Sequence, residues 1–284
     1  MLVIAGLGIY GLRDLTLGTL EYLKRADAVY VESYTSLIPD FNVRDLEGLV
    51  GRNAVVIGRN VIEGEKLYEI IEMAREKLVV LLAPGDPFIA TTHIVIKLEA
   101  IKRGVEVQYL PAPSVVNAIS AATGLDFYKF CQPVTIVSPR PSYFPLTPYY
   151  VLVENLKRGL HTLFLLELDV ERGYAMRAEE AAQLLRSMEE RVGKGIIDCE
   201  ETLFVSVARA SSPSQIVKAF KLTSTPDFGP PPHVLIVPGL LNPVEKEALQ
   251  LIAGASPLDV EKWHSRVKAL MKEKRVIAYN SAIS

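Results

Sequence analysis

The length and composition of the chain indicate a globular protein of ordinary size. It has 284 residues, of which 49% are hydrophobic, and its 31 basic and 33 acidic side chains nearly balance. Direct binding to a phosphate backbone usually needs a strong basic excess, so nucleic acid is not the expected partner. A chain of this length suits two domains better than one.

The apolar segments predict neither a membrane span nor a signal peptide. The run at residues 78–83 is far shorter than the roughly 20 residues that a membrane helix needs. The apolar start, residues 1–5, is followed at once by glycines, which does not fit a signal peptide. Cys131 and Cys199 lie far apart without a CxxC pair, and the histidines have no ligand-like spacing. We therefore expect a cytoplasmic protein without a metal site.

The first part of the chain alternates strand and helix signals. Apolar runs predict strands at residues 2–7, 28–31, 54–57, 78–82 and 105–110. Helical spacing predicts helices at residues 15–24, at 67–74, and from about Ile89 to a left-handed stop at Gly104. Repeated βα units of this kind predict an α/β protein with a mostly parallel, doubly wound sheet.

The prolines of Pro111-Ala112-Pro113 predict a domain junction, which divides the chain into residues 1–112 and 113–284. Further strands are expected at residues 160–168, 204–208 and 234–237. Capping and periodicity predict helices at residues 147–159, at 178–188, after Ser212-Pro213, and from 256 to about 274. Residues 228–233 are proline-rich and predict a stiff loop.

A literal G-x-G-x-x-G, residues 6–11, follows the first strand, and Glu32 ends the second strand as a ribose-binding acid would. Alone, this pattern favours an NAD-dependent oxidoreductase. However, further residues follow Gly11 before the helix, and Asp14 or Thr16 is the expected helix cap. The glycines would then form a wider loop at the sheet edge.

The turn Gly85-Asp86-Pro87 follows the fourth strand, where open α/β sheets bind their ligands. Pro84 and Pro87 stiffen the turn, and Gly85 lets a ligand approach the backbone. Asp86 could hydrogen-bond a ribose or an amino group. Its alternative role is an Asx turn or a helix cap.

These motifs in combination resemble the tetrapyrrole methylase superfamily, and more closely its diphthine synthase family. The glycine loop with Asp14 and Thr16 beyond it, followed by Pro-Gly-Asp-Pro, carries the first resemblance. The second is carried by VYVESYTS at 29–36, ATTH at 90–93, PSV at 113–115, ARAS at 208–211 and PPHVLIVPG at 231–239. The similarity runs from residue 2 to about residue 243.

The resemblance implies two α/β domains with a cofactor cleft between them and S-adenosyl-L-methionine as methyl donor, leaving S-adenosyl-L-homocysteine. It implies cofactor contacts at Ile9, Asp86, Ile89, Ser114, Val115, Leu166, Ala210 and His233. Methyl transfer from a sulfonium needs alignment and exclusion of water rather than a metal, so many contacts can be made by backbone and small side chains. No residue is assigned as catalytic.

The resemblance also implies a protein acceptor and a homodimer. The acceptor is the amine of the 3-amino-3-carboxypropyl-histidine of translation elongation factor 2, which methylation converts to diphthine. Candidates for the region that meets this acceptor are Arg13, Lys129 and Arg140. Asp126 and Tyr128 either line the cleft or belong to an ordinary loop.

Several alternatives stay open at the level of sequence. A corrin-precursor methyltransferase would share the fold; an NAD-dependent oxidoreductase and a non-catalytic binding protein belong to other classes. His233 either contacts the cofactor or is satisfied by backbone, which is the common fate of a lone histidine. His93 is expected to be structural. Glu32 and Tyr34 either lie near the substrate or simply end their strand.

Overall fold

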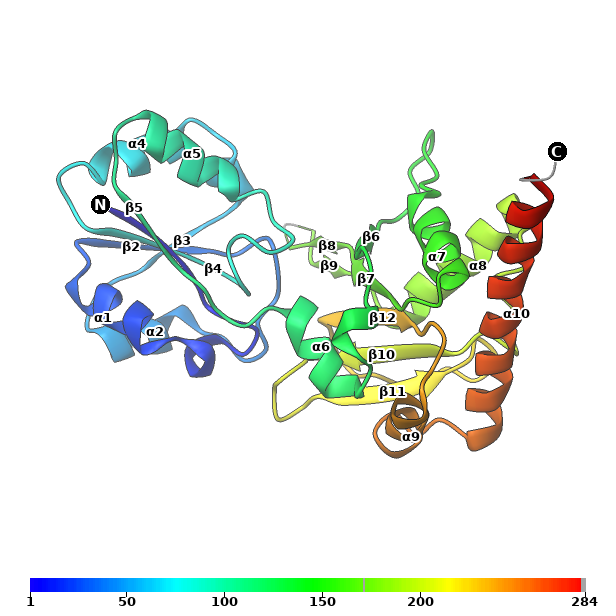
Figure 1. Ribbon diagram of the computed structural model, residues 1–284. Coiled ribbons are helices and arrows are strands. Elements are labelled where there is room, and N and C mark those ends of the chain that lie inside the picture. Colours follow the sequence, from blue (N-terminus) through cyan, green and yellow to red (C-terminus); the bar gives the residue numbers. More distant parts are fainter. Residues whose placement is uncertain (171, 282–284) are drawn as a thin grey trace. The chain divides into compact units, whose positions relative to one another are not determined.

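The protein is described by a computed structural model that covers residues 1–170 and 172–281. It divides into two compact units (Figure 1). The first consists of Met1–Ala118 with Leu168–Tyr174 and Ser211–Pro213; the second contains the rest of the chain. No helix in the described residues is long and apolar enough to cross a membrane.

The first unit is built on a parallel sheet of strand order β3-β2-β4-β1-β5. Its elements in chain order are β1 (Leu2–Gly6), the 3-10 helix η1 (Gly11–Asp14), α1 (Leu17–Arg25), β2 (Ala28–Glu32), α2 (Val43–Val50), β3 (Val55–Ile57), α3 (Arg59–Ile62), α4 (Lys66–Met73), β4 (Val79–Ala83), α5 (Ile94–Lys102) and β5 (Val107–Leu110). The predicted mostly parallel α/β arrangement is confirmed.

Helices cover both faces of this sheet, with α1 and α2 on one face and α4 and α5 on the other (Figure 1). Leu23 of α1 and Leu46 of α2 pack in one core, whereas Ile71 of α4 and Ile96 of α5 pack in the other. The central strands β1 and β4 are buried along their whole length, and their sequences are therefore continuously apolar. The predicted helical face at residues 67–74 is buried as expected.

The helix expected from Ile89 begins later than predicted, at Ile94. Ala90 takes φ 57°, a left-handed conformation that a helix cannot contain, and residues 86–93 therefore form a loop. The predicted stop at Gly104 is confirmed by its φ of 70°. Helix α2 was not predicted, since its eight residues give a short pattern; Asn42 caps it by accepting a hydrogen bond from the Arg44 amide.

The second unit contains a sheet of order β11-β10-β12-β7-β6, in which only the β6–β7 pair is parallel. Its elements are η2 (Phe127–Lys129), β6 (Val134–Ile136), α7 (Thr147–Lys157), β7 (Thr162–Leu166), α8 (Ala178–Val192), β10 (Phe204–Ala208), β11 (Ile216–Phe220), β12 (His233–Val237), α9 (Pro243–Leu251) and α10 (Pro257–Ser281). Helix α6 (Val115–Thr123) joins the units along the chain, and β8 (Leu168–Asp169) pairs with β9 (Tyr174–Ala175).

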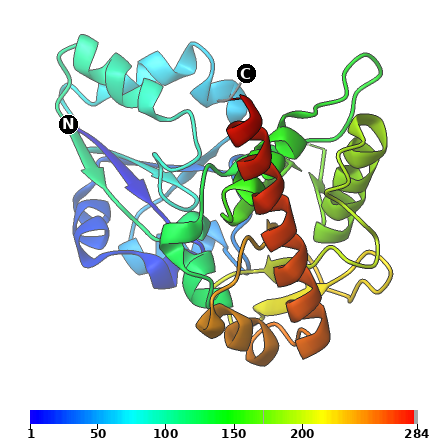
Figure 2. The same cartoon turned by 45° about the vertical axis from the view of Figure 1, so that its right-hand side comes forward.

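The long helix α10 packs on α7 and α9, as Figure 2 shows from a second side. Trp263 of α10 is fully buried, and its indole Nε1 donates a hydrogen bond of 2.9 Å to the Pro238 carbonyl. This contact fixes α10 on the loop that follows β12. The helix predicted from residue 256 is confirmed and is longer than expected.

The helix predicted after Ser212-Pro213 is wrong, because this segment is the strand β11. β11 pairs antiparallel with β10, and the rings of Phe204 and Phe220 stack across the pair with centroids 5.4 Å apart. The β-branched Ile216 and Val217 favour a strand, and the cross-strand aromatic pair stabilises it. A Ser-Pro pair alone does not decide between a helix start and a turn.

Candidate functional site

The candidate site of the first unit lies where β1 and β4 end side by side. After β1 the chain passes to α1 on one face of the sheet, and after β4 it passes to α5 on the opposite face. The two exit loops therefore diverge at this point. Such a switch point is where open α/β sheets leave a crevice for a ligand.

The two sequence motifs meet at this switch point through their backbones. The Gly8 amide donates to the Gly85 carbonyl at 3.1 Å, and the Gly85 amide donates to the Gly8 carbonyl at 2.8 Å. A Cβ added to Gly6 would lie 2.4 Å from the Gly85 oxygen, so only glycine allows this approach. The structure thus joins the glycine loop and the Gly-Asp-Pro turn, which the sequence could only list separately.

Asp14 closes the glycine loop. Its Oδ2 accepts hydrogen bonds from the amides of Ile9 at 2.9 Å and Tyr10 at 2.7 Å. Thr16 caps α1 by accepting a bond from the Thr19 amide at 3.1 Å. The wide loop and the cap at Thr16 are as predicted, and the glycines do not open a helix as they would in a dinucleotide site.

The Asp86 carboxylate is buried and accepts three hydrogen bonds. Its Oδ1 accepts from the Phe88 amide at 2.9 Å, which is the Asx turn foreseen from the sequence. Its Oδ2 accepts from the Tyr109 hydroxyl at 2.6 Å and from the Ala112 amide at 3.2 Å. Burial, together with this bond to Asp86, raises the pKa of Tyr109 to about 12. Asp86 therefore shapes the turn and ties it to the end of β5.

The remaining predicted residues of the first unit lie close to these loops in the chain. Ile9 is half-buried in the glycine loop, and Ile89 is 39% exposed in the loop after Asp86. Ser114 is buried beside α6; its amide donates to Asn117 Oδ1 at 3.0 Å, and Val115 begins the helix.

The three predicted residues of the second unit gather at one edge of its sheet. Leu166 ends β7, His233 begins β12, and Ala210 follows β10. These strands are neighbours in the order β10-β12-β7 and run antiparallel, so the end of β7, the start of β12 and the end of β10 meet. The sequence offered no way to see this juxtaposition.

His233 is buried, and backbone groups satisfy its imidazole. Its Nδ1 accepts from the Ala178 amide at 3.2 Å, and its Nε2 donates to the Pro230 carbonyl at 3.2 Å. Burial lowers the pKa of this histidine, which keeps the ring uncharged at neutral pH. The backbone alternative considered for His233 is present, and its contact with a cofactor stays a prediction.

Arg209 shapes the same edge and was not singled out from the sequence. The residue is 6% exposed, and its Nη1 donates to the carbonyls of Phe228, at 2.9 Å, and Pro230. Its Nε and Nη2 donate to the Ser214 carbonyl at 3.1 and 2.9 Å. Arg209 thereby fixes the proline loop that leads into His233. The only signal for it was its position inside the Ala-Arg-Ala-Ser segment.

A family model with the description Tetrapyrrole (Corrin/Porphyrin) Methylases matches residues 1–225. The chain belongs to this family. Similar curated proteins include the diphthine synthase of Methanocaldococcus jannaschii, 41% identical over 256 residues, which cover 89% of this chain and 98% of that protein. The diphthine synthase of Methanococcus maripaludis is also 41% identical, over 254 residues, with the same shares.

Solved structures agree with this assignment to the tetrapyrrole methylases. A crystal structure of a diphthine synthase is 32% identical with a TM-score of 0.81, covering 92% of this chain and 99% of that one. The structure of a putative diphthine synthase from Entamoeba histolytica is 31% identical with a TM-score of 0.82, covering 90% and 99%. The fold is that of this methylase family, and the chain is a methyltransferase.

The first unit of this methylase also holds a buried polar cluster at the ends of β2 and the loop before α5. Glu32 and His93 are each 1% exposed, and Glu32 Oε2 lies 3.6 Å from His93 Nε2. Tyr34 stacks on the imidazole with ring centroids 6.2 Å apart. Burial raises the pKa of Glu32 and lowers that of His93 to about 4, so the imidazole is uncharged at neutral pH.

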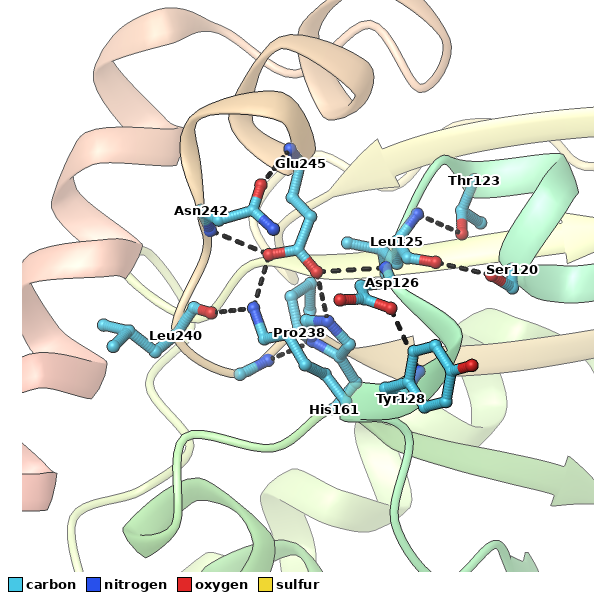
Figure 3. Close-up of polar contacts among 12 residues, drawn as sticks. Ser120, Thr123, Leu125, Asp126, Tyr128, His161, Pro238, Leu240, Asn242 and Glu245 are labelled. Atoms are coloured by element: carbon cyan, nitrogen blue, oxygen red, sulfur yellow. Dashed lines mark hydrogen bonds and ion pairs between the residues drawn. The ribbon is translucent and has the colours of Figure 1, made fainter.

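The second unit holds a different buried polar cluster, drawn in Figure 3. Glu245 accepts from His161 Nε2 at 2.8 Å and the Asp126 amide at 3.0 Å through Oε1. Its Oε2 accepts from Lys129 Nζ and the Asn242 amide. The cluster ties η2, the start of β7 and the start of α9 together.

This cluster bears on the candidates for the acceptor region. The Lys129 ammonium is engaged by Glu245 and by the Leu240 carbonyl. Asp126 caps η2 by accepting from the Tyr128 amide at 3.0 Å, and the Tyr128 side chain is 91% exposed. The exposed Arg140 and Arg13 stay predictions as acceptor contacts.

Proposed function

We propose that this methyltransferase transfers methyl groups from S-adenosyl-L-methionine to the amine of the 3-amino-3-carboxypropyl-histidine of translation elongation factor 2, giving diphthine. The observation that carries the proposal is the backbone pairing of Gly8 with Gly85 at the switch point of the parallel sheet. The similarity to diphthine synthases over most of the chain supports the choice of acceptor.

The residues at the switch point fit an adenosyl cofactor. Gly85 takes φ 65°, and the position that a Cβ would occupy has no heavy atom within 4 Å, so a ligand can approach its backbone. Ile9 and Ile89 offer apolar side chains at the same loops. We assign Ile9, Asp86 and Ile89 as cofactor contacts, with Asp86 acting chiefly by shaping the turn. The cofactor supplies a methyl group on a sulfonium.

The other proposed contacts come from the resemblance and from their place in the fold. Ser114 and Val115 lie at the start of α6, and Leu166, Ala210 and His233 share one edge of the second sheet. Buried His233 and its carbonyl partner Pro230 give this edge a fixed shape. Small and apolar side chains suit a site whose task is to align the reactants and exclude water.

Calorimetry with S-adenosylhomocysteine and with NAD tests the cofactor. We expect S-adenosylhomocysteine to bind and NAD not to bind. Binding of NAD alone would refute the proposed methyl donor, and so would binding of neither compound.

A methyl-label assay tests the acceptor. Elongation factor 2 that carries the aminocarboxypropyl-histidine should take up label, and elongation factor 2 with the unmodified histidine is the control. Label in a corrin precursor, with none in the modified elongation factor, would replace the proposed acceptor with the same-fold alternative.

We also propose that the enzyme is a cytoplasmic homodimer. The exposed apolar residues Ile94, Leu98 and Ile101 repeat along one face of α5, and such faces commonly mark contact surfaces. Sedimentation of the full chain should give twice the monomer mass, and a monomer at all concentrations would refute the dimer.

A further inference from the structure

The cluster of Glu32, Tyr34 and His93 is buried but incompletely hydrogen-bonded. Within the described part of the chain, neither ring nitrogen of His93 has a hydrogen-bond partner, nor does the Tyr34 hydroxyl. A buried polar group without a partner destabilises the folded state, because its hydrogen bonds to water are lost and not replaced. Folded proteins rarely keep such groups in a core that could hold apolar side chains instead, so each one calls for an explanation.

The Glu32 carboxylate accepts its hydrogen bonds from the turn that directly follows it in the chain. Oε1 accepts from the amides of Tyr34 and Thr35, and Oε2 accepts from the Thr35 hydroxyl. Oε2 is also the atom that faces His93 Nε2 at 3.6 Å. This distance is just longer than a hydrogen bond, so a small movement of the ring would form one.

The element that carries His93 is the loop of the proposed cofactor site. The loop leaves the switch point at Asp86 and reaches α5 at His93. It is braced internally by a hydrogen bond from the Thr91 hydroxyl to the Pro87 carbonyl, and Ala90 holds an uncommon left-handed conformation. Asp86 anchors one end of the loop, and His93 is the side chain that faces the sheet at the other end.

We propose that His93 is a positioning residue for the loop 86–92: its Nε2–H donates to Glu32 when the methyl donor occupies the site, which fixes the loop for binding. This inference rests on the proposed function. The hydrogen bond is formed as the loop moves toward its ligand-bound position, and part of the binding energy of the methyl donor is coupled to it. His93, expected from the sequence to be structural, thereby acts on the cofactor through Ile89 and the backbone of the loop.

Calorimetric titration with S-adenosylhomocysteine tests the inference in three variants. His93→Leu keeps the volume and removes the donor; His93→Gln places an amide donor close to the position of Nε2. Glu32→Gln keeps one acceptor oxygen and removes the charge. We expect His93→Leu to weaken binding about tenfold, equivalent to about 1.4 kcal/mol, and His93→Gln to restore most of it. The double variant with His93→Leu and Glu32→Gln should bind S-adenosylhomocysteine as tightly as the weaker-binding of the two single variants.

The control is His161→Leu, the same substitution in a buried Glu–His pair remote in the chain from the loop. It should lower the unfolding temperature without changing the affinity of the folded protein. Unchanged affinity in His93→Leu, with wild-type binding intact, overturns the inference and leaves the proposed function standing. If the wild-type chain does not bind S-adenosylhomocysteine, both the inference and the proposed function are refuted. If His93→Leu does not fold, Glu32→Gln replaces it in the comparison: weaker binding than wild type supports the inference, and unchanged binding overturns it.

Discussion

The two units each bury a glutamate beside a histidine, and the two pairs differ in how fully they are hydrogen-bonded. Glu245 and His161 are 2.8 Å apart, and the remaining nitrogen of His161 accepts from the Gly239 amide at 2.7 Å. Glu32 and His93 are 3.6 Å apart, and both ring nitrogens of His93 lack partners in the described residues. Burial is the same, since each of the four residues is at most 1% exposed.

The difference separates a structural pair from one that we assign to function. Burial alone would raise the pKa of Glu245, but its bonds from His161, Lys129 and two amides outweigh this and lower the pKa to about 2. For Glu32, burial outweighs its local hydrogen bonds, and the pKa is raised. A fully satisfied pair stabilises the fold, whereas an unsatisfied pair costs stability unless binding completes it.

The largest effect is expected for Glu245→Ala. It leaves His161 and Lys129 without their carboxylate, and the loss of one partner of a buried pair costs about 3–5 kcal/mol. Urea unfolding measures it. The control is Glu247→Ala, at an exposed position of α9, the helix that also carries Glu245. It should change the free energy of unfolding by less than about 0.5 kcal/mol. A loss from Glu245→Ala no larger than the control's would show that the pair is not structural.

The pH dependence of stability should carry the signature of Glu245. Its folded pKa of about 2 lies below the usual 4.5, so the ionised carboxylate stabilises the fold above the unfolded pKa. This stabilisation, on the order of 3 kcal/mol, is lost as the pH falls from about 4.5 to 2. The difference in unfolding free energy between wild type and Glu245→Gln should shrink over that window; a constant difference would contradict the assignment.

The contribution of Glu32 to the pH dependence of stability should have the opposite sign. Because its folded pKa is raised, the protonated carboxyl is favoured in the folded state, and acid relieves a cost that is present at neutral pH. Wild type should therefore gain stability relative to Glu32→Gln as the pH falls through the raised pKa. A loss in acid would mean that Glu32, like Glu245, is held as a carboxylate by the fold.

A smaller effect is expected for His161→Leu. It removes one donor from Glu245 and the acceptor of the Gly239 amide, which should cost about 1–3 kcal/mol. Thermal unfolding measures the loss, and the conservative His161→Gln should recover part of it. Equal stability of His161→Leu and wild type would remove the structural role of this pair.

The smallest effect on stability is expected for His93→Leu. An apolar side chain of similar size replaces an imidazole that makes no hydrogen bond, so the free energy of unfolding should stay the same or rise by about 1 kcal/mol at most. The same measurement on both histidine variants gives the comparison directly. A loss as large as that of His161→Leu would show that the Glu32–His93 bond already exists without ligand.

Much of the fold follows from local pattern. The 3.6-residue spacing at Leu67, Ile70 and Ile71 predicts α4, because these residues must share one face to be buried. The same reasoning predicts α8, whose apolar face is fully buried. It fails for β11 and α2, where the segments are short and a Ser-Pro pair or a few apolar residues fit more than one structure.

For the candidate site, the sequence predicts two ligand-binding loops, each of which contains a glycine motif and follows a buried strand. It could not determine that Gly8 and Gly85 would bond, since that depends on the order β4-β1 in the sheet. Nor could it assign the partners of Asp86 or distinguish His93 from His161. Strand order, burial and hydrogen-bond geometry arise from contacts between residues far apart in the chain, and only the tertiary structure decides them.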